Sequence, residues 1–499
     1  MSLDRIFSID RQIVPSIETP NRDYRLDPSR YSERGERMLR HLKLLGFPLP
    51  QIGELPEFRS IYLPNRFSRN YLDDVDHGVP MLGTSTMFMV RLPVDSRIPI
   101  KDDFTASPLR ILPGDILISR SGTVGTTVLC GESYTGHVAS DDCFRLRLNG
   151  DMKAFTAAYL QSPFGKTLLT RDGHGKVIRH LKERDIRNLR VPIIPSSQLE
   201  TVSLLMSEAV KLTDDARKLL MESEMELDIV LGIPSAAVTS QLWLNWQNKS
   251  YLKASDSLLN NRLDPHFYDP DIGHLRNALA AMAEKTLGEI STLWMPTRFA
   301  RPRAERGFGI PFYSSADIMR AHREPSATIS NRASRYLNTC MVETETILIC
   351  RSGAFGGIMG RAMFVSPGMD GWAISEHMVR CKVTDSDYIP EYVFGCLGSL
   401  RYGYPLITAY RHGKDVPELD PSELGSIPIP KLAKKEQERI AQPIREALAN
   451  LDRANELERE SQRELLTVLD WSEDDEIPPG TDSITELATE AEEEYAEHE

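Results

Sequence analysis

Two long stretches of the chain carry apolar residues at alternating steps of three and four, the spacing that lines one face of an α-helix. The first stretch runs from about residue 196 to 231, and its apolar seam is Val202, Leu205, Ala209, Leu212, Ala216 and Leu219. The second ends near residue 469, and its seam is Ile440, Ile444, Ala447, Leu451 and Ala454. A helix of about 35 residues is roughly 50 Å long. The pattern therefore predicts two long amphipathic helices of similar length.

The ends of these helices carry further signals. Ser196 and Ser197 are N-cap candidates for the first helix, and Glu200 could complete a capping box with Ser197. In the second helix, Pro443 falls in the early turns, where we expect a kink.

The rest of the chain alternates short β-branched runs with turns. The run ILPGDILIS at 111–119 has a Pro-Gly-Asp turn before an apolar stretch and predicts a strand. The Arg-Ser-Gly that follows it predicts a tight turn, in which Gly122 and its counterpart Gly353 would need a positive φ or close backbone approach. Helical patterns appear near 155–162 and 271–284. The mixture predicts an α+β fold.

The chain also contains two copies of one unit. RLDPSRY at 25–31 returns as RLDPHFY at 262–268, and ILISRSGTVG at 116–125 returns as ILICRSGAFG at 347–356 with seven of ten positions identical. Five shorter matches keep the same order and nearly the same offset along the chain. Chance similarity would not hold register over seven blocks, so we infer an internal duplication.

Each copy ends in one of the two long helices. We therefore predict two homologous α+β domains separated by two long antiparallel helices in a coiled coil, because two seams of similar length can bury each other. The alternative is that each helix packs only on its own domain.

Net charge bears on the possible partners. The formal charge is −13, but residues 473–499 carry twelve acidic side chains and no Lys or Arg, and the remainder is at −1. Within that remainder, 298–335 holds eight arginines against three carboxylates, and 174–190 holds six basic residues against two. Basic patches on a nearly neutral body are compatible with nucleic-acid binding. The acidic tail itself is typical of a solvated, disordered segment, or of a strand that mimics phosphate charge.

The six cysteines form no Cys-x-x-Cys pair, and they predict buried, reduced thiols. No stretch approaches the ~20 apolar residues that a membrane-spanning helix needs, and the N-terminus has no secretory pattern. We expect a cytoplasmic protein without a membrane partner.

Several ordered motifs together resemble a known family. GDILISRSGTVG, then Ser140-Asp141-Asp142, then YLQSPFGKTLL and GKVIRHLKERDIRNLRVPIIP, are similar to the target-recognition domain of type I restriction–modification specificity subunits. PIPKLAKKEQERI at 428–440 resembles the start of the conserved helix of that family. The resemblance covers about 25–469. The second copy departs from it, with RYGYPLIT in place of the SPFG segment, Lys-Asp-Val-Pro in place of Val-Ile-Arg-His, and Ser375-Glu376-His377 in place of Ser-Asp-Asp.

The resemblance implies a DNA-binding subunit of a bacterial antiphage defence system that reads a bipartite target in double-stranded DNA. It would recruit two adenine methyltransferase subunits through the spacer helices, and a translocase or nuclease subunit could join. It implies no cofactor of its own, whereas the partner methyltransferase would use S-adenosylmethionine. We expect an N-terminal extension (1–20), a first target-recognition domain (21–195) and a first spacer helix (196–235). A second target-recognition domain (236–430), a second spacer helix (431–471) and the acidic tail (472–499) would follow.

Basic residues at loops and turns are the candidates for DNA contact, since guanidinium groups can pair with guanine edges or phosphates. They are Arg66, Arg69, Arg120, Lys176, Arg179, His180, Arg298, Arg301, Arg303, Arg306, Arg351 and Lys414. For Arg120 and Arg351 an ion pair within the domain is an equal alternative.

Catalytic motifs are missing from the sequence. It contains no Asn/Asp-Pro-Pro-Tyr/Phe motif of adenine methyltransferases, no phosphate-binding G-x-x-x-x-G-K-[ST] loop and no metal-ligand spacing. We therefore expect a non-catalytic protein. The remaining alternatives are a protein-binding scaffold and a stand-alone nuclease with an unrecognised site.

Overall fold

The computed structural model describes most of the chain in twelve segments. They are 33–72, 78–94, 96–99, 107–122, 124–171, 180–233, 265–298, 300–304, 309–332, 337–353, 357–413 and 417–471. Below, the N-terminal half means the described residues before 196, and the C-terminal half means those from 265 to 433.

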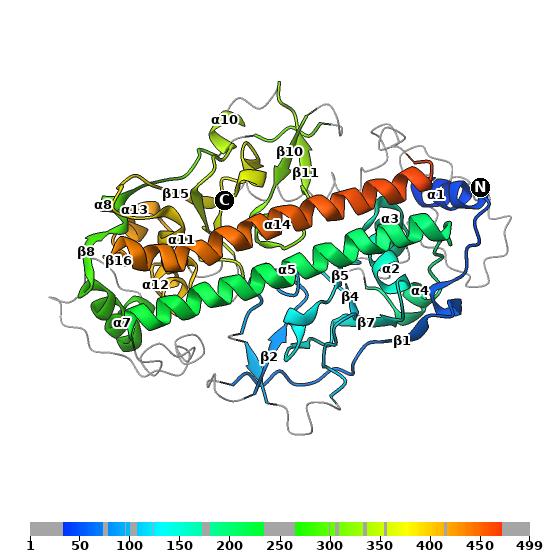
Figure 1. Cartoon of the computed structure of the whole chain (residues 1–499), viewed down its shortest axis with the longest axis horizontal. Helices are drawn as coiled ribbons and strands as arrows, with labels where there is room; N and C mark the ends of the chain where they lie inside the picture. Colours follow the sequence, from blue (N-terminus) through cyan, green and yellow to red (C-terminus); the bar gives the residue numbers. More distant parts are fainter. Residues whose placement is uncertain are drawn as a thin grey trace, which may run out of the picture.

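Two long helices form the axis of the molecule. They are α5 (Ser196–Leu231) and α14 (Lys434–Val468), which lie side by side and antiparallel (Figure 1). Their direction is fixed by two buried hydrogen bonds, from Ser223 Oγ to the carbonyl of Ile440 (2.9 Å) and from Ser461 Oγ to the carbonyl of Val202 (3.1 Å). Ser461 is the equivalent of Ser223 in the second copy, and Ile440 is the equivalent of Val202, because both pairs are the same distance apart in the sequence. The two contacts are therefore related by an internal twofold axis.

The seam between these helices is built as the periodicity predicts. Ala209, Ala454 and Leu457 are buried against one another, with Leu205 and Leu212 packed on them. The ends of the helices differ in part from the prediction. The N-cap of α5 is Pro195, with no side-chain cap bond, so the expected Ser197 cap is wrong. The fixed φ of Pro195 holds the entry to the helix instead. In α14, Pro443 lies inside the helix and does not end it.

The N-terminal half contains two sheets. The larger has the order β1-β7-β4-β5 and the smaller the order β3-β2-β6. Helix α1 precedes these strands and three helices follow the larger sheet. The elements are α1 (Glu33–Leu44), β1 (Phe58–Tyr62), β2 (Val79–Leu82), β3 (Arg97–Ile98), β4 (Ile116–Ser119), β5 (Thr127–Leu129), β6 (Val138–Ala139), β7 (Cys143–Leu148), α2 (Met152–Gln161), α3 (Pro163–Arg171) and α4 (Glu183–Arg187).

The C-terminal half repeats this plan with sheets β9-β15-β12-β13 and β11-β10-β14. A short pair, β8 with β16, joins its two ends. The elements are α7 (Pro270–Ala280), β8 (Ala283–Thr286), α8 (Leu287–Ile290), β9 (Ser291–Trp294), β10 (Ile310–Tyr313), α9 (Ser315–Met319), β11 (Ala327–Ile329), α10 (Leu337–Cys340), β12 (Thr346–Cys350), β13 (Ala362–Phe364), β14 (Ala373–Ile374), β15 (Met378–Val383), α11 (Pro390–Gly398), α12 (Gly403–Ala409), α13 (Pro421–Leu424) and β16 (Pro428–Pro430). The α+β class is confirmed.

Several local predictions can be compared with these elements. The strand predicted before each Arg-Ser-Gly turn is present as β4 and β12, and Gly122 and Gly353 have φ of 72° and 141°, as expected for the turn. The helix predicted over 271–284 is too long, because Glu284 lies in β8. The second copy also has an equivalent of the SPFG segment. Gly403 begins α12 against the carbonyls of Cys396 and Leu397, as Gly165 lies in α3 against Tyr159 and Leu160.

Each half buries its core against opposite ends of the helix pair. The core of the N-terminal half includes Val202 and Met206 from the start of α5 and Leu465 from the end of α14. The core of the C-terminal half includes Leu227 from the end of α5 and Ile440 from the start of α14. Hydrophobic burial thus places the halves at the two ends of one rod, on opposite sides of it in Figure 1.

The halves also meet directly beside the rod. Val90 N donates to Met319 O and Ala321 N donates to Phe88 O, both at 2.9 Å, around an antiparallel bridge between Met89 and Arg320. We call this contact the junction. The prediction that the helices alone hold the halves apart is therefore incomplete.

Candidate nucleic-acid interface

One turn in each half gathers several of the predicted arginines. In the N-terminal half this turn is Ser140-Asp141-Asp142, between β6 and β7, and in the C-terminal half it is Ser375-Glu376-His377, between β14 and β15. The two turns occupy the same place in the duplicated sheets. We call the groups of side chains around them the N-cluster and the C-cluster.

A buried arginine holds each turn. Arg145 of β7 is fully buried and donates to the carbonyls of Ser140 (3.0 Å) and Leu109 (2.9 Å). Arg380 of β15, its equivalent, is 1% exposed and donates to Cys340 O (3.0 Å) and Ile374 O (3.3 Å). Burial lowers the pKa of both guanidinium groups, to about 10 for Arg380. The carbonyl acceptors offset part of the cost of burying these charges and fix the backbone of the turn.

The first carboxylate of each turn pairs with an arginine from a preceding loop. Arg69 Nη2 lies 2.6 Å from Asp141 Oδ1, and its hydrogen bond to Asp141 raises the pKa of Arg69. At the equivalent place, Arg301 Nη2 lies 3.3 Å from Glu376 Oε1 and stacks over the ring of Phe312. The carboxylates are nearly buried, whereas the Arg69 and Arg301 side chains stay 42% and 35% exposed. Each arginine is thus oriented by a nearly buried carboxylate, while part of its side chain stays accessible to a ligand.

The third residue of each turn contacts the Arg-Ser-Gly motif. Arg120 Nη1 pairs with Asp142 Oδ1 at 3.0 Å, and Ser121 Oγ donates to the same carboxylate. In the C-cluster, His377 stands where Asp142 does and its Nδ1 lies 3.4 Å from Ser352 Oγ.

The arginine of the C-cluster uses a different partner. Arg351 forms its ion pair with Glu418, although the backbone bonds from Arg120 to Asp142 and from Arg351 to His377 are the same. The backbone of the two clusters is conserved between the copies while the exposed chemistry differs.

One further candidate lies shortly before the exposed arginine of each cluster in the sequence. Arg66 and Arg298 precede Arg69 and Arg301 by three residues, and both are exposed, as is Arg303. Within the described segments, neither Arg66 nor Arg298 forms an ion pair. Such groups are available for phosphates, while Arg69 and Arg301 are preoriented for a base edge or a phosphate.

The remaining candidates divide into two groups. Arg120 and Arg351 are engaged in ion pairs within their own halves, so the alternative of an intradomain salt bridge holds for both. His180 is half-buried, at an isolated bridge position near β4. Lys176, Arg179, Arg306 and Lys414 lie outside the described residues.

The carboxylates and the histidine of the clusters were not among the predicted site residues. The signal for Asp141, Asp142, Glu376 and His377 was present in the sequence, as the difference between Ser-Asp-Asp and Ser-Glu-His at equivalent positions. A carboxylate can take part in base recognition as an arginine does, because it can accept a hydrogen bond from cytosine N4 or orient an arginine. A pattern of basic residues alone does not include them.

Other kinds of site were also sought. In the described segments no group of three His, Cys, Asp or Glu side chains is placed to hold a metal ion. All six cysteines are buried and free, as predicted, and burial raises the pKa of Cys350 to about 12. Of the described helices, none has the length and apolar content to cross a bilayer.

Similarity to known proteins is found among solved structures, at low sequence identity and low TM-score. The sequence matches no known family model and no curated protein. It is similar to the crystal structure of a type I restriction–modification S subunit from M. genitalium, at 13% identity and a TM-score of 0.32, over 85% of this chain and 95% of that one.

A second similar structure is the HsdS subunit from Thermoanaerobacter tengcongensis, at 17% identity and a TM-score of 0.25, over 85% of this chain and 96% of that one. A third belongs to a type I R-M system studied for complex assembly and conformational transition, at 17% identity and a TM-score of 0.24, over 85% and 98% of the two chains. The first two structures are S subunits, the family that the sequence motifs resemble.

Proposed function

We propose that this chain is the DNA-specificity subunit of a type I-like restriction–modification complex and reads a bipartite target in double-stranded DNA. Residues 21–195 and 236–430 act as the two target-recognition domains, and 196–235 and 431–471 as the spacer helices. The chain itself is non-catalytic and needs no cofactor.

One observation carries this proposal: the internal twofold axis that relates the described parts of the two copies. The same sheet, turn and arginine cluster occur twice, and each copy is packed at one end of an antiparallel helix pair. Modules related by a twofold axis present the same surface to DNA in opposite directions, so they read half-sites on opposite strands at a separation set by the protein. The duplicated architecture supports this reading by itself.

The two half-sites should differ in sequence. Arg69 is held by Asp141, which Asp142 follows in the turn, whereas Arg301 is held by Glu376, which His377 follows. An imidazole in place of a carboxylate exchanges an acceptor-only group for one that can also donate. Such an exchange changes which base edge fits.

Partner subunits supply the chemistry in this proposal. Two adenine methyltransferase subunits, which use S-adenosylmethionine, dock on the spacer helices, and a translocase or nuclease subunit can join. In support, Met221, Met225 and Ile229 form an apolar stripe on α5 at one-turn spacing, and each is at least 60% exposed. Exposed apolar stripes of this kind mark protein interfaces.

Selection from random duplex DNA tests the proposal. The full chain with its partner methyltransferase is incubated with the library at moderate salt, and bound DNA is sequenced. The expected result is a split motif with two unlike half-sites at one fixed spacing. Recovery of DNA without any common motif would contradict the proposal, and salt-insensitive partner binding with no DNA shift would point to a protein-binding scaffold.

A further inference from the structure

The junction between the halves repeats the internal twofold symmetry of the helix pair. Phe88 and Val90 of the N-terminal half are equivalent to Met319 and Ala321, because both pairs are separated by the same interval of the sequence. The two equivalent segments bond to each other, with reciprocal backbone hydrogen bonds of 2.9 Å. This is the pattern of an isologous interface, in which each surface contacts its own copy.

Each side of the junction is anchored to the helix that follows its own half. Arg217 of α5 donates to the carbonyls of Val90 (3.0 Å) and Met89 (2.8 Å). Asn455 of α14, the equivalent of Arg217 in the second copy, donates to Ala321 O at 3.0 Å and accepts from Arg323 N at 2.9 Å. Both anchors are buried, so the junction is attached to the rod at two equivalent points.

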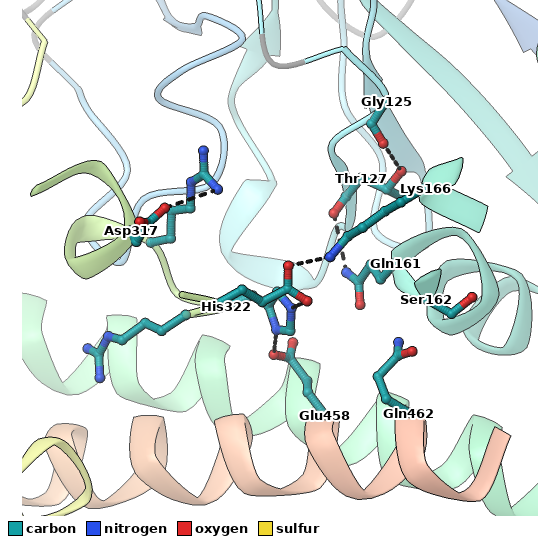
Figure 2. Close-up of polar contacts among 12 residues, drawn as sticks. Gly125, Thr127, Gln161, Ser162, Lys166, Asp317, His322, Glu458 and Gln462 are labelled. Atoms are coloured by element: carbon teal, nitrogen blue, oxygen red, sulfur yellow. Dashed lines mark hydrogen bonds and ion pairs between the residues drawn. The ribbon is translucent and has the colours of Figure 1, made fainter. Parts of the chain in front are cut away.

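Charged side chains then connect each half to the other across the helices. On one side, Lys166 of α3 pairs with Glu324, Glu324 Oε1 lies 2.9 Å from His322 Nε2, and His322 Nδ1 pairs with Glu458 of α14. Figure 2 shows Lys166, His322 and Glu458 converging from the N-terminal half, the C-terminal half and α14. This chain of ion pairs links three separate elements.

The opposite side has a second connection, which is built from other residues. Arg91, at the position equivalent to His322, lies 3.4 Å from Glu224 of α5. Glu224 in turn accepts from Ser399 Oγ (2.8 Å) and Leu400 N (2.9 Å) of the C-terminal half. Each connection therefore joins the N-terminal half, the C-terminal half and one of the two long helices. The first connection includes α14 and the second includes α5.

His322 and Glu324 are held in their charged forms. Burial alone would lower the pKa of His322, but Glu458 and Glu324 outweigh it and raise the pKa to about 10. Burial likewise opposes ionisation of Glu324, yet His322 and Lys166 hold its pKa far below the ordinary value. The charged His322 lies between Glu324 and Glu458, and Lys166 pairs with Glu324, so the four side chains form one network. Networked ion pairs hold their partners together better than isolated surface pairs do.

We propose that the junction is a second spacer: it locks the relative orientation of the two halves and so selects the spacing between DNA half-sites, together with the helix pair. The selection of half-site spacing rests on the proposed function, whereas the orientation lock does not. A two-helix rod by itself can bend or twist along its length. A direct bond between the halves beside the rod removes that freedom, and binding then discriminates against targets that require another orientation.

Charge reversal at the edge of the junction tests the lock without emptying a core. Lys166 is 42% exposed, and Lys166→Glu places a third carboxylate beside Glu324 and Glu458. The matched control is Lys211→Glu on α5, where the lysine is exposed and lies 4.0 Å from Glu208 of the same helix. Thermal unfolding verifies that both variants fold.

The first measurement uses no DNA. Spin labels at Arg59→Cys on β1 and Thr292→Cys on β9, both exposed strand positions, report the distance between the halves, since the six native thiols are buried. We expect a narrow distance distribution in the parent protein and in Lys211→Glu, and a clearly broader or shifted one in Lys166→Glu. An unchanged distribution in Lys166→Glu overturns the lock.

The second measurement uses DNA targets with the native half-site spacing and with one base pair more or less. The parent protein should prefer the native spacing, and Lys166→Glu should lower that preference about tenfold while binding the native target within about threefold of the parent. Broadened distances with unchanged spacing preference overturn the role in selectivity. Failure of the parent protein itself to bind any split target contradicts the proposed function, and the distance measurement still decides the lock.

Discussion

Equivalent residues of the two halves share a backbone but not a chemistry. Arg120 and Arg351 each receive a backbone bond from a leucine after the helical segment, Leu181 or Leu419, at 3.2 and 3.0 Å. Their side chains nevertheless form ion pairs with different partners. Arg120 pairs with Asp142 and Arg351 pairs with Glu418, and these two carboxylates lie in different parts of the repeat. A duplicated framework of this kind can diverge in what it recognises without losing its fold.

The exposed arginines give a direct test of DNA contact at the residue scale. Arg66→Ala and Arg298→Ala should each weaken DNA binding and reduce the slope of log K against log salt by about 0.9, as expected when one phosphate contact is lost. Binding titrations at several salt concentrations measure both quantities. Arg453→Ala, on the exposed face of α14 beside Glu456, is the control and should leave the slope unchanged. A slope equal to that of the parent protein in all three variants would show that Arg66 and Arg298 do not contact DNA phosphates.

The protonation of His322 gives a second test. Its folded pKa, about 10, lies above the value near 6.5 of an unfolded histidine, so its stabilising contribution is complete below about pH 6.5 and is lost as the pH rises towards 10. His322→Gln should therefore lower the free energy of unfolding by roughly 2 kcal/mol at pH 6.5 and by much less at pH 10. Denaturant titrations at both pH values measure the difference. His274→Gln, an exposed position on α7, should be neutral throughout. A penalty independent of pH would mean that the charge is not involved.

At the scale of the elements, the helix pair depends on small residues where the helices approach. Ala209 is fully buried and packs with Ala454 and Leu457, while larger residues such as Val202 and Ile440 lie towards the ends of the pair. The small side chains at the centre allow the helices to lie close together, and the serine bonds to Ile440 and Val202 then form at both ends. The register of the rod follows from this arrangement.

Overpacking this centre tests the account. Ala209→Leu should lower the free energy of unfolding by about 1–3 kcal/mol, because the added methyl groups have no space without moving the helices apart. Ala449→Leu makes the same change on the exposed face of α14 and should cost less than about 0.5 kcal/mol. Denaturant unfolding of both variants gives the comparison. Equal effects of the two substitutions would argue that the helices do not pack closely at Ala209.

At the scale of the whole molecule, charge is distributed very unevenly. Trp471 ends the described chain, packed against His41 and Phe164 at ring distances of 5.2 and 4.9 Å. Beyond it lie twelve carboxylates and no Lys or Arg, and without them the formal net charge of −13 becomes −1. The tail therefore dominates the long-range field that approaching DNA would meet.

Truncation after Trp471 should consequently strengthen non-specific DNA binding. We expect an increase in affinity of about threefold to tenfold at 50 mM salt, which disappears at several hundred millimolar, where the Debye length falls below about 6 Å. Fluorescence anisotropy with a random duplex at both salt concentrations measures it. A full-length variant with the tail carboxylates changed to amides should behave like the truncation. Unchanged affinity at low salt would show that the tail does not act on DNA through its charge.

The sequence alone determined the elements whose causes are local or repeated. Periodicity placed two long helices within a few residues of α5 and α14, because a seam of steps of three and four leaves no other regular conformation. The Pro-Gly-Asp turn placed β4, and the repeat of its motif at 347–356 placed β12. The Arg-Ser-Gly turns required the positive φ of Gly122 and Gly353. The duplicated motifs implied a second copy of the same sheet, and the order of the motifs resembles that of a family of DNA-reading subunits.

Only the tertiary structure decided which side chains meet. That Asp141 orients Arg69, that Glu418 and not His377 pairs with Arg351, and that Phe88 and Val90 bond to Ala321 and Met319 could not be predicted. These contacts join residues that lie far apart in the sequence. The two ion pairs depend on how loops pack within each half, and the backbone bonds depend on how the halves pack beside the helix pair. A local sequence pattern carries no information about distances set by such packing.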